Sequence, residues 1–432
     1  MARVKKIEDK TFFSKLHEVL GFGSPEELDE YRACLFPIGK STDENQTTSI
    51  FLASLSAVKE YREELFTQIG VKKINNRNIQ LHIYVEIPCN GGDDRPDGLI
   101  VLTSGMKNPV IEWVSFVESK IGNNDIDSIQ IERYVRFAKE LGIQNLITIS
   151  NQLVTSPCES PANINKRLKC NLYHWSWIYL SVTAGRLLNS NTIEDIDHVY
   201  LLSELRRYFN RHKGVKNYRA MEASWSDATK VFIEKSNKIL VEEIVQSYLQ
   251  EEKDICLQVT EDTGQYIKLK TNNKSREEIV SKMLEKDKVI SSTFYIQDNP
   301  SQTFTMDVDF VSRRLTCYTR YSISKGKAKA QTSRMINIIC GDDISIEDEI
   351  EIGAIYPRMS QNNVEFCSLA TLLKEQKEGK YSFVNSERGD TIKEFEIKMT
   401  YDLGKDFHRP QVIVDKLENL AKVYFRKVFT QL

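Results

Sequence analysis

The sequence predicts a mixed α/β fold, with a mixed central sheet flanked by helices, followed by a C-terminal α+β domain. Two observations favour this fold class. Between residues 79 and 150, runs typical of strands and helices follow in the order strand, strand, strand, helix, strand. Beyond residue 222 the rhythm of helices and strands changes, and 432 residues suffice for two or three domains. We therefore expect one domain over residues 1–222 and a second over 223–432.

The composition is that of an ordinary globular protein. Hydrophobic residues make up 41% of the chain, charged residues make up 28%, and the formal net charge is −2. This excludes a globally basic nucleic-acid-binding protein, although a local basic patch is compatible with it. The sequence has no apolar run of about 18 residues, and its charged first residues lack the apolar core of a secretion signal. We expect a cytoplasmic protein with no membrane partner.

The eight cysteines form no metal-binding pattern. None belongs to a CxxC pair, and their spacing is irregular. Zinc and iron–sulfur sites need clustered thiolates, so we expect neither kind of site. In a reducing compartment these residues are predicted to be mostly buried free thiols.

Hydrophobic spacing predicts the elements of the first domain in order. One or two short helices are expected within residues 11–37, and an amphipathic helix over 47–69 that Gly70 ends. A further helix runs up to Gly142, because apolar residues keep helical spacing from Ile131 onward. Strands are predicted at 79–87, 99–102, 110–121 and 146–150.

The end of the first domain is rich in aromatic and basic residues. Residues 171–183 are predicted to form a strand with Trp175 and Trp177 on one face and His174 on the other. A helix over 192–212 is expected to begin at a capping box of Thr192 and Asp195. Cations are favoured at the C-terminus of a helix, and the same place suits a phosphate contact. The cations at this helix end are Arg206, Arg207, Arg211, His212 and Lys213, followed by Lys216.

The second domain has no recognisable chemical motif. Its best candidate for a phosphate contact is the basic segment SKGKAKAQTSR at 324–334, for which a solvated loop is an equally good interpretation. The predicted elements are a helix at 241–251, a hairpin at 255–270, a helix at 275–286, strands at 289–296, 303–310 and 313–323, and a helix at 411–429.

One short motif is set aside. Gly39, Lys40 and Ser41 resemble the end of a phosphate-binding P-loop. The full pattern needs a glycine five residues before Gly39, where this chain has Cys34, and no apolar strand leads into the loop. We interpret these residues as a polar loop.

The chemically informative stretch runs from Arg95 to Tyr134. Glu118 and Lys120 lie two apart in a predicted strand and so point to the same face. Asp97 begins the preceding strand, and a hairpin through residues 103–109 would place it near Glu118. Two close carboxylates favour a hard divalent cation such as Mg²⁺, which can polarise a phosphate and activate water. Lys120 would orient or deprotonate that water, or stabilise the transition-state charge.

These residues resemble a known nuclease family. Arg95-Pro96-Asp97-Gly98 followed by Val117-Glu118-Ser119-Lys120 is similar to the motif of the PD-(D/E)XK, or restriction-endonuclease-like, superfamily. The resemblance implies a restriction-endonuclease-like core that uses Mg²⁺ or Mn²⁺. It implies that Asp97, Glu118 and the carbonyl of Ser119 bind the metal, and that Lys120 is catalytic together with the two acids. The separation of 21 residues (118 − 97) lies within the range that the family tolerates.

The next helix extends the resemblance. Gln130 and Tyr134 resemble the QxxxY helix of the exonuclease-like branch, which implies that they position substrate, and at i and i+4 they share a helix face. Some members also carry a glutamate near the first helix. Glu44 is the best-placed match, with Glu60, Glu63 and Glu64 as rivals. The resemblance covers residues 44–150.

Structural interpretations stand beside these functional ones. Asp97, Glu118 and Lys120 could form a solvated strand face with a surface ion pair, and Tyr134 also lies on the apolar stripe of its helix. Glu44 could simply be an acid that the dipole favours at a helix N-terminus.

The predicted function is hydrolysis of DNA phosphodiester bonds, with RNA as the open alternative and either endo- or exonucleolytic cleavage. Bacterial restriction or antiphage defence is the setting that the family suggests. The alternatives are a catalytically inactive nuclease fold that acts as a nucleic-acid-binding or assembly module, and an unrelated α/β protein. The C-terminal domain would recognise DNA, bind a partner protein or form a homodimer.

Overall fold

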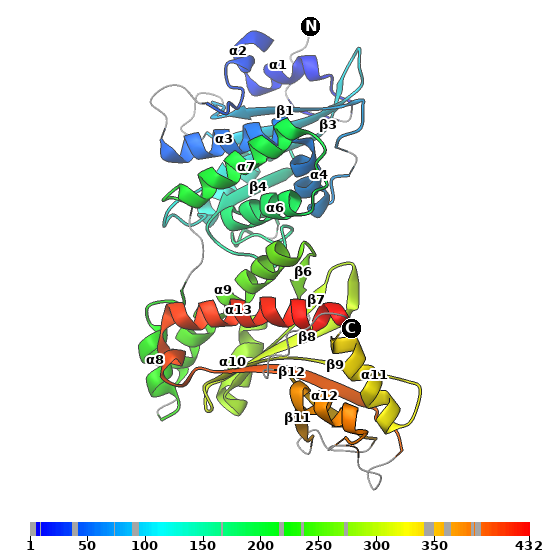
Figure 1. Cartoon of the computed structure of the whole chain (residues 1–432). Coiled ribbons are helices and arrows are strands. Elements are labelled where there is room, and N and C mark those ends of the chain that lie inside the picture. Colours follow the sequence, from blue (N-terminus) through cyan, green and yellow to red (C-terminus); the bar gives the residue numbers. More distant parts are fainter. Residues whose placement is uncertain are drawn as a thin grey trace. The chain divides into compact units, whose positions relative to one another are not determined.

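A computed structural model of the chain shows two compact units, Met1–Asn217 and Tyr218–Leu432, which we call unit 1 and unit 2 (Figure 1). The division lies shortly before the predicted boundary at 222/223, and Met221 already belongs to unit 2, where its N–H donates to the carbonyl of Pro410. The structure describes residues 6–8, 10–36, 42–72, 74–88, 95–165, 167–215, 220–234, 237–271, 275–340, 350–357, 364–381, 384 and 390–432.

Unit 1 contains a mixed five-stranded sheet in the order β1-β2-β3-β4-β5. The first three strands pair antiparallel, and β3, β4 and β5 pair parallel. The parallel strand β4 reads NLITIS and is buried along its whole length, as expected for a strand covered on both faces. The strands are β1 (Ile79–Val85), β2 (Gly98–Ser104), β3 (Val110–Ser119), β4 (Asn145–Ser150) and β5 (Asn171–Ser176).

Helices cover both faces of this sheet. Apolar residues of α1, α2 and α5 share one core cluster with Phe116 of β3 and Leu146 of β4. On the other face, Phe51 of α3 and Phe66 of α4 pack edge-on against Trp175 of β5. Figure 1 shows α7 beside α3 on this face. The helices are η1 (Phe13–Lys15), α1 (Leu16–Leu20), α2 (Pro25–Asp29), α3 (Asp43–Ala57), α4 (Lys59–Gln68), α5 (Ser128–Glu140), α6 (Trp177–Asn189) and α7 (Ile196–Arg211).

The mixed α/β class is confirmed, and several element predictions for unit 1 need correction. The helix predicted over 47–69 is two helices, because Val58 is extended and separates α3 from α4. The strand predicted over 171–183 ends at Ser176, whose hydroxyl accepts from the N–H of Tyr179 and begins α6. The cap of α7 is Asp195, not Thr192.

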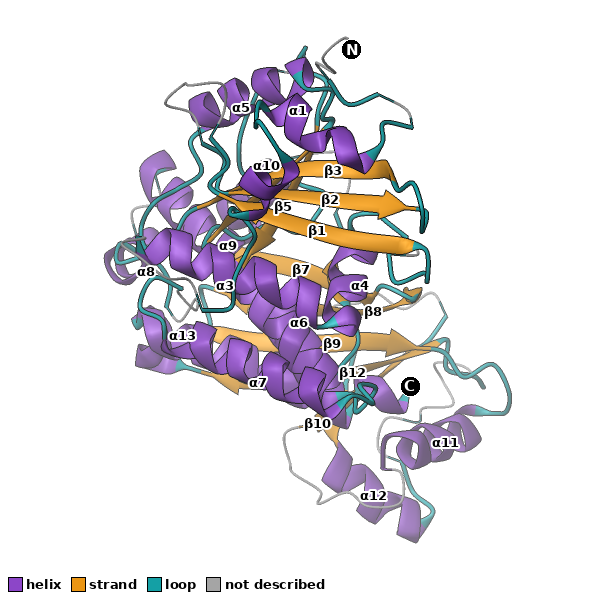
Figure 2. Ribbon diagram, turned by 90° about the horizontal axis from the view of Figure 1, so that it is seen from above, coloured by secondary structure: helices purple, strands orange, loops and turns teal. Residues whose placement is uncertain are grey.

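Unit 2 is built on a seven-stranded antiparallel sheet in the order β11-β10-β12-β9-β8-β7-β6. Helix α13 packs on it through Tyr424 and Phe425, which contact Phe304 of β8. Figure 2 shows α11 and α12 next to each other, and α12 contacts β10 and β11 at one edge. The strands are β6 (Ile267–Leu269), β7 (Val289–Ile296), β8 (Asn299–Asp309), β9 (Arg314–Tyr321), β10 (Ile350–Ile355), β11 (Phe366–Ser368) and β12 (Glu394–Asp402).

One prediction for unit 2 is wrong. The hairpin expected over 255–270 is absent, because α9 continues to Thr263, where Gly264 ends it in a left-handed conformation. The second of its two expected strands is present as β6, which pairs with β7. The helix expected from Ser275 is confirmed as α10. The helices are α8 (Trp225–Phe232), α9 (Lys238–Thr263), α10 (Arg276–Asp287), α11 (Ala328–Cys340), α12 (Leu369–Glu378), η4 (Gly404–His408), α13 (Pro410–Lys427) and η5 (Phe429–Gln431).

Candidate active site

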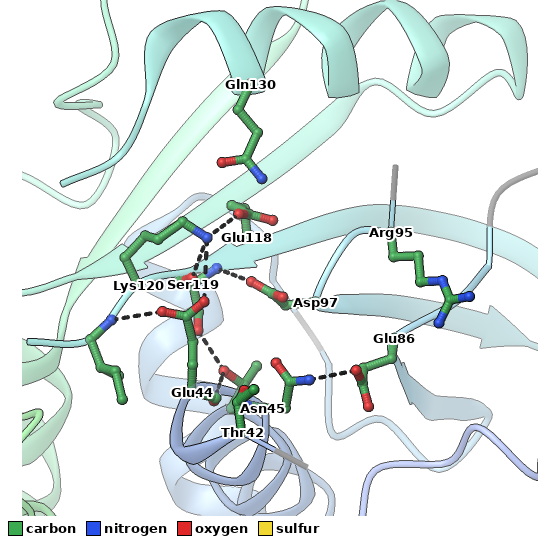
Figure 3. Close-up of polar contacts among 12 residues, drawn as sticks. Thr42, Glu44, Asn45, Glu86, Arg95, Asp97, Glu118, Ser119, Lys120 and Gln130 are labelled. Atoms are coloured by element: carbon green, nitrogen blue, oxygen red, sulfur yellow. Dashed lines mark hydrogen bonds and ion pairs between the residues drawn. The ribbon is translucent and has the colours of Figure 1, made fainter. Parts of the chain in front are cut away.

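Asp97 and Glu118 come together because β2 and β3 form the predicted hairpin. Gly98, the first residue of β2, lies opposite Val117 of β3. The residue before it, Asp97, therefore faces the end of β3, where Glu118 is the last residue but one. Asp97 accepts a hydrogen bond from the N–H of Ser119, with 2.6 Å between Oδ2 and N (Figure 3).

The glycine after Asp97 lets α3 approach this strand end. A Cβ atom at Gly98 would lie 2.7 Å from Leu52 Cδ1 on α3 and 3.2 Å from Val117 Cβ. A larger residue would therefore push α3 away. The close approach brings Thr48 of α3 to Ser119, with their hydroxyl oxygens 2.5 Å apart.

Lys120 is fixed through its main chain as well as its side chain. Its N–H donates to the carbonyl of Ile149 on β4 at 2.8 Å, and its carbonyl accepts from the indole N–H of Trp177 at 2.9 Å. The ammonium Nζ lies 2.5 Å from Glu118 Oε1, 3.1 Å from the carbonyl of Ser119 and 3.4 Å from Glu44 Oε1. Only 18% of the Lys120 side chain is exposed.

Glu44 joins the site from α3. It lies in the first turn of that helix, which begins at Asp43, and Thr42 caps the helix by accepting from the N–H of Asn45. Besides its contact with Lys120, Glu44 accepts from the N–H of Ile121 through Oε2 at 3.1 Å. The acid is thus both a residue of a helix N-terminus and a neighbour of the predicted catalytic lysine.

The two carboxylates are poorly neutralised. Burial raises the pKa of Asp97 well above its usual range, and the charge of Glu118 raises it further, against the opposing N–H of Ser119 and the ammonium of Lys120. Burial also raises the pKa of Glu118, although its contacts with Lys120 lower it. Glu118 is 1% exposed, and its Oε2 has no hydrogen-bond partner within the described part of the chain. A proton or a cation between the carboxylates would remove this imbalance.

Lys120 stays charged in this setting. Burial of its ammonium lowers its pKa, but the charge and hydrogen bond of Glu118, with further contributions from Asp97 and Glu44, raise it above the usual value overall. A lysine surrounded by acids is a fixed positive charge at neutral pH.

The donor atoms suit a hard divalent cation. Two carboxylates and the carbonyl of Ser119 supply oxygen ligands only, and Mg²⁺ usually takes one or two protein carboxylates together with waters and substrate oxygens. Within the residues that the structure describes, no group of three or more His, Cys, Asp or Glu side chains is placed to hold a metal. The predicted metal ligands differ from such a group, because they are two side-chain carboxylates, of Asp97 and Glu118, and one main-chain carbonyl, of Ser119. The unpaired Oε2 of Glu118 fits this chemistry.

Gln130 and Tyr134 differ in their placement. Gln130 points from α5 toward Glu118 (Figure 3). Its amide Nε2 donates to the hydroxyl of Tyr134 at 3.1 Å. Tyr134 is 3% exposed, and its hydroxyl donates to the carbonyl of Arg95 at 3.1 Å. Tyr134 therefore belongs to the core and orders the chain before Asp97, while Gln130 faces the carboxylates.

Several residues of the site were not predicted. Thr48 and Trp177 hold Ser119 and Lys120, as described above. Asn45 donates to Glu86 Oε1 at 2.5 Å, and the N–H of Glu86 donates to the carbonyl of Asp97 at 3.2 Å. The contacts of Asn45, Trp177 and Thr48 join residues 41 to 71 positions apart, so no local pattern in the sequence indicates them.

Most of the other residues considered as functional candidates lie in the core or in a helix. His174 is fully buried, with Nδ1 2.8 Å from Thr148 Oγ1 and Nε2 2.8 Å from the carbonyl of Gln152. Trp175 and Trp177 are core residues. The basic segment 324–334 contains the start of α11. Residues 39–41 lie outside the described residues.

Two further findings bear on the whole chain. Among the described residues, no helix combines the length and the apolar character needed to cross a bilayer. No family model matches the sequence, and no match was found among curated proteins.

Proposed function

We propose that the chain is a metal-dependent nuclease that hydrolyses DNA phosphodiester bonds, with unit 1 as a restriction-endonuclease-like core. The observation that carries the proposal is the juxtaposition of the buried carboxylate of Glu118, the half-buried carboxylate of Asp97 and the ammonium of Lys120 at the ends of two paired strands. The order of an antiparallel hairpin, a helix and a parallel strand supports the same assignment. Bacterial restriction or antiphage defence is the proposed setting by family analogy.

In this proposal Asp97, Glu118 and the carbonyl of Ser119 hold Mg²⁺ or Mn²⁺. The bound ion would polarise the scissile phosphate and lower the pKa of a bound water. The N–H of Ser119 orients Asp97, and Thr48 holds Ser119 from α3. The close approach of Leu52 to Gly98 packs α3 against this side of the site.

Lys120 supplies fixed positive charge beside the reacting phosphate. Its raised pKa favours electrostatic stabilisation of the transition state over abstraction of a proton. Glu44 gives the ammonium a second carboxylate partner when Glu118 is engaged elsewhere. The amide of Gln130 faces the same carboxylates and suits a water or a phosphate oxygen.

A cleavage assay on circular plasmid DNA with Mg²⁺ or Mn²⁺ tests the proposal. Asp97→Asn, Glu118→Gln and Lys120→Met should each lower the cleavage rate at least about a hundredfold. Glu112→Gln is the matched control, because Glu112 is an exposed glutamate on the same strand, β3. Cleavage by Glu118→Gln at the wild-type rate would refute the proposal. If the wild-type protein binds DNA without cutting it, the inactive nuclease-fold alternative takes its place.

A further inference from the structure

Two exposed cations lie where α7 ends. Arg211 is the last residue of the helix, and Lys213 follows two positions later. Both side chains are exposed, and neither forms an ion pair with another described residue. Their charges are therefore available to an external anion.

The end of α7 is attached to the helix that carries Glu44. The hydroxyl of Tyr208 lies 2.9 Å from Thr47 Oγ1, and His212 Nε2 lies 3.5 Å from the same oxygen. Thr47 is three residues after Glu44 in α3, so these contacts are made one turn away from it. Arg211 is three residues after Tyr208 and therefore lies on the same side of α7.

A second attachment joins the residues after α7 to the strand end that carries Lys120. The carbonyl of Gly214 accepts from the N–H of Gly122 at 2.7 Å and from Asn151 Nδ2 at 2.9 Å. Asn151 Nδ2 also donates to the carbonyl of Gly122 at 2.9 Å. Gly122 is two residues beyond Lys120. Lys213, the neighbour of Gly214, is thus held close to the carboxylate site.

Arg95 provides a cation on another side of the site. It is exposed and precedes Asp97 by two residues. In Figure 3, Asp97 lies between Arg95 and Lys120. The carboxylates of Asp97, Glu118 and Glu44 would repel a nucleic-acid backbone, and exposed cations on both sides offset that repulsion.

We propose that Arg211 and Lys213 bind phosphates of the DNA backbone on one side of the scissile bond, and that Arg95 binds a phosphate on the other. This inference rests on the proposed function of the same site. The contacts are to the backbone, so they support binding of any DNA sequence.

The helix dipole alone does not account for this arrangement. Cations are favoured at the C-terminal end of any helix, and the C-terminal half of α5 also carries exposed cations: Lys139 in the last turn, and Arg136, which pairs with Glu132. Helix α5 begins beside the site at Gln130 and carries these cations toward its other end. Substitution of both residues removes the same two charges, including the cation in the last turn of the helix, away from the carboxylates.

Binding of a fluorescent DNA duplex to the full chain, measured by anisotropy in EDTA and in a Glu118→Gln background, tests the inference. Arg211→Ala/Lys213→Ala should weaken binding about tenfold or more at low salt, equally for unrelated sequences. The slope of log affinity against log salt should fall by about 0.9 for each lost phosphate contact, hence by about two for the pair and one for Arg95→Ala. Arg136→Ala/Lys139→Ala is the matched control and should leave affinity and slope unchanged.

Each outcome decides the inference. Arg211→Lys/Lys213→Arg should restore most of the affinity, because it keeps both charges. Unchanged affinity and slope in Arg211→Ala/Lys213→Ala, an equal loss in the α5 control, or no DNA binding by the parent protein would overturn the inference. The plasmid assay tests the proposed function separately. If the wild-type protein does not cleave plasmid DNA but the variants show the expected salt slopes, the proposed cleavage is refuted and the proposed phosphate contacts are supported.

Discussion

Only one of the two carboxylate oxygens of Glu118 has a hydrogen-bonding partner among the described residues. Lys120 contacts Oε1, whereas Oε2 is buried without a hydrogen-bond partner among the described residues. A buried carboxylate in this state either keeps a proton or binds a cation. If unit 1 binds the proposed metal, this carboxylate would link the stability of the unit to metal binding.

Divalent cations should raise the melting temperature of unit 1. A ligand that binds only the folded state at about 100 times its Kd stabilises by about 2.7 kcal/mol. Differential scanning fluorimetry with Mg²⁺ or Mn²⁺ against EDTA measures the shift. Asp97→Asn and Glu118→Gln should lose it, and Glu112→Gln should keep it. A shift of wild-type size in Asp97→Asn would contradict the predicted ligand set.

Two buried acids of α9 predict a stability that falls with rising pH. Glu251 and Asp254 are fully buried, and neither carboxylate oxygen of Glu251 has a hydrogen-bond partner among the described residues. Burial raises the pKa of Glu251 well above its usual range, and the charges of Asp254 and Glu418 raise it further. The folded state therefore holds protons that the unfolded chain releases near its ordinary pKa of about 4. The contribution to stability is complete below that pH and is lost as pH rises through the folded-state pKa.

Glu251→Gln should flatten this pH dependence. The amide cannot ionise, so the free energy of unfolding should fall less steeply, by up to about 1.4 kcal/mol per pH unit for the one group removed. Urea unfolding between pH 5 and pH 9 measures it. Glu242→Gln, an exposed position on the same helix, should keep the wild-type slope. Parallel pH profiles for wild type and Glu251→Gln would show that Glu251 is not the titrating group.

At the scale of elements, the junction of β5 and α6 determines where Lys120 lies. Ser176 ends the strand and caps the helix, and this places Trp177 so that its indole reaches the carbonyl of Lys120. With the bond from Lys120 N–H to Ile149, both main-chain groups of the lysine are fixed by neighbouring elements. The position of the ammonium thus depends on a helix start 57 residues away.

Trp177→Phe should destabilise unit 1 more than Trp175→Phe does. Both tryptophans are fully buried, but Trp175 Nε1 has no hydrogen-bond partner in the described part of the structure. The two substitutions remove a similar volume, and only the first leaves the carbonyl of Lys120 unpaired. The difference in free energy of unfolding should be about 1–2 kcal/mol, measured by urea denaturation. An equal loss in both variants would show that the bond to Lys120 contributes nothing.

Helices and strands whose apolar residues follow one clear spacing could be predicted from the sequence. Segments whose apolar spacing suits both a helix and a strand could not. The strands β3, β4 and β7 and the helices α5 and α10 lie within a few residues of their predicted bounds. The α9 prediction failed because its C-terminal half contains apolar runs that suit a buried strand or a buried helix equally. Residues 171–183 failed for a related reason, since alternating aromatics continue past the serine that begins α6.

Some residues of the candidate site could likewise be predicted from the sequence, and others could not. Asp97, Glu118 and Lys120 lie on two strands joined by a short turn, so local pairing brings them together. Thr48 and Trp177 reach the site only through helix packing on the sheet, which no spacing in the sequence specifies. Glu44 lies between these cases: its place at a helix start was predictable, and its contact with Lys120 was not.

At the scale of the whole molecule, each unit has a core of its own. One buried cluster is made of residues from unit 1, including Phe116 and Leu146, and a larger one is made of residues from unit 2, including Phe304 and Tyr424. Separate cores predict separate cooperative transitions. Calorimetry of the full chain should resolve two transitions, of which Trp177→Phe shifts one and Glu251→Gln the other. A single transition that both substitutions shift would show that the units unfold together.

The β2–β3 hairpin also offers a place to attach a probe. The carboxylates lie at one end of these strands, and the turn with the exposed side chain of Met106 lies at the other, about 20 Å away for a seven-residue strand. A cysteine introduced at Met106, in a variant that lacks the exposed Cys34 and Cys158, would carry a fluorophore or a surface tether. Such a handle would allow single molecules to be immobilised by the end of the hairpin that lies away from the carboxylates.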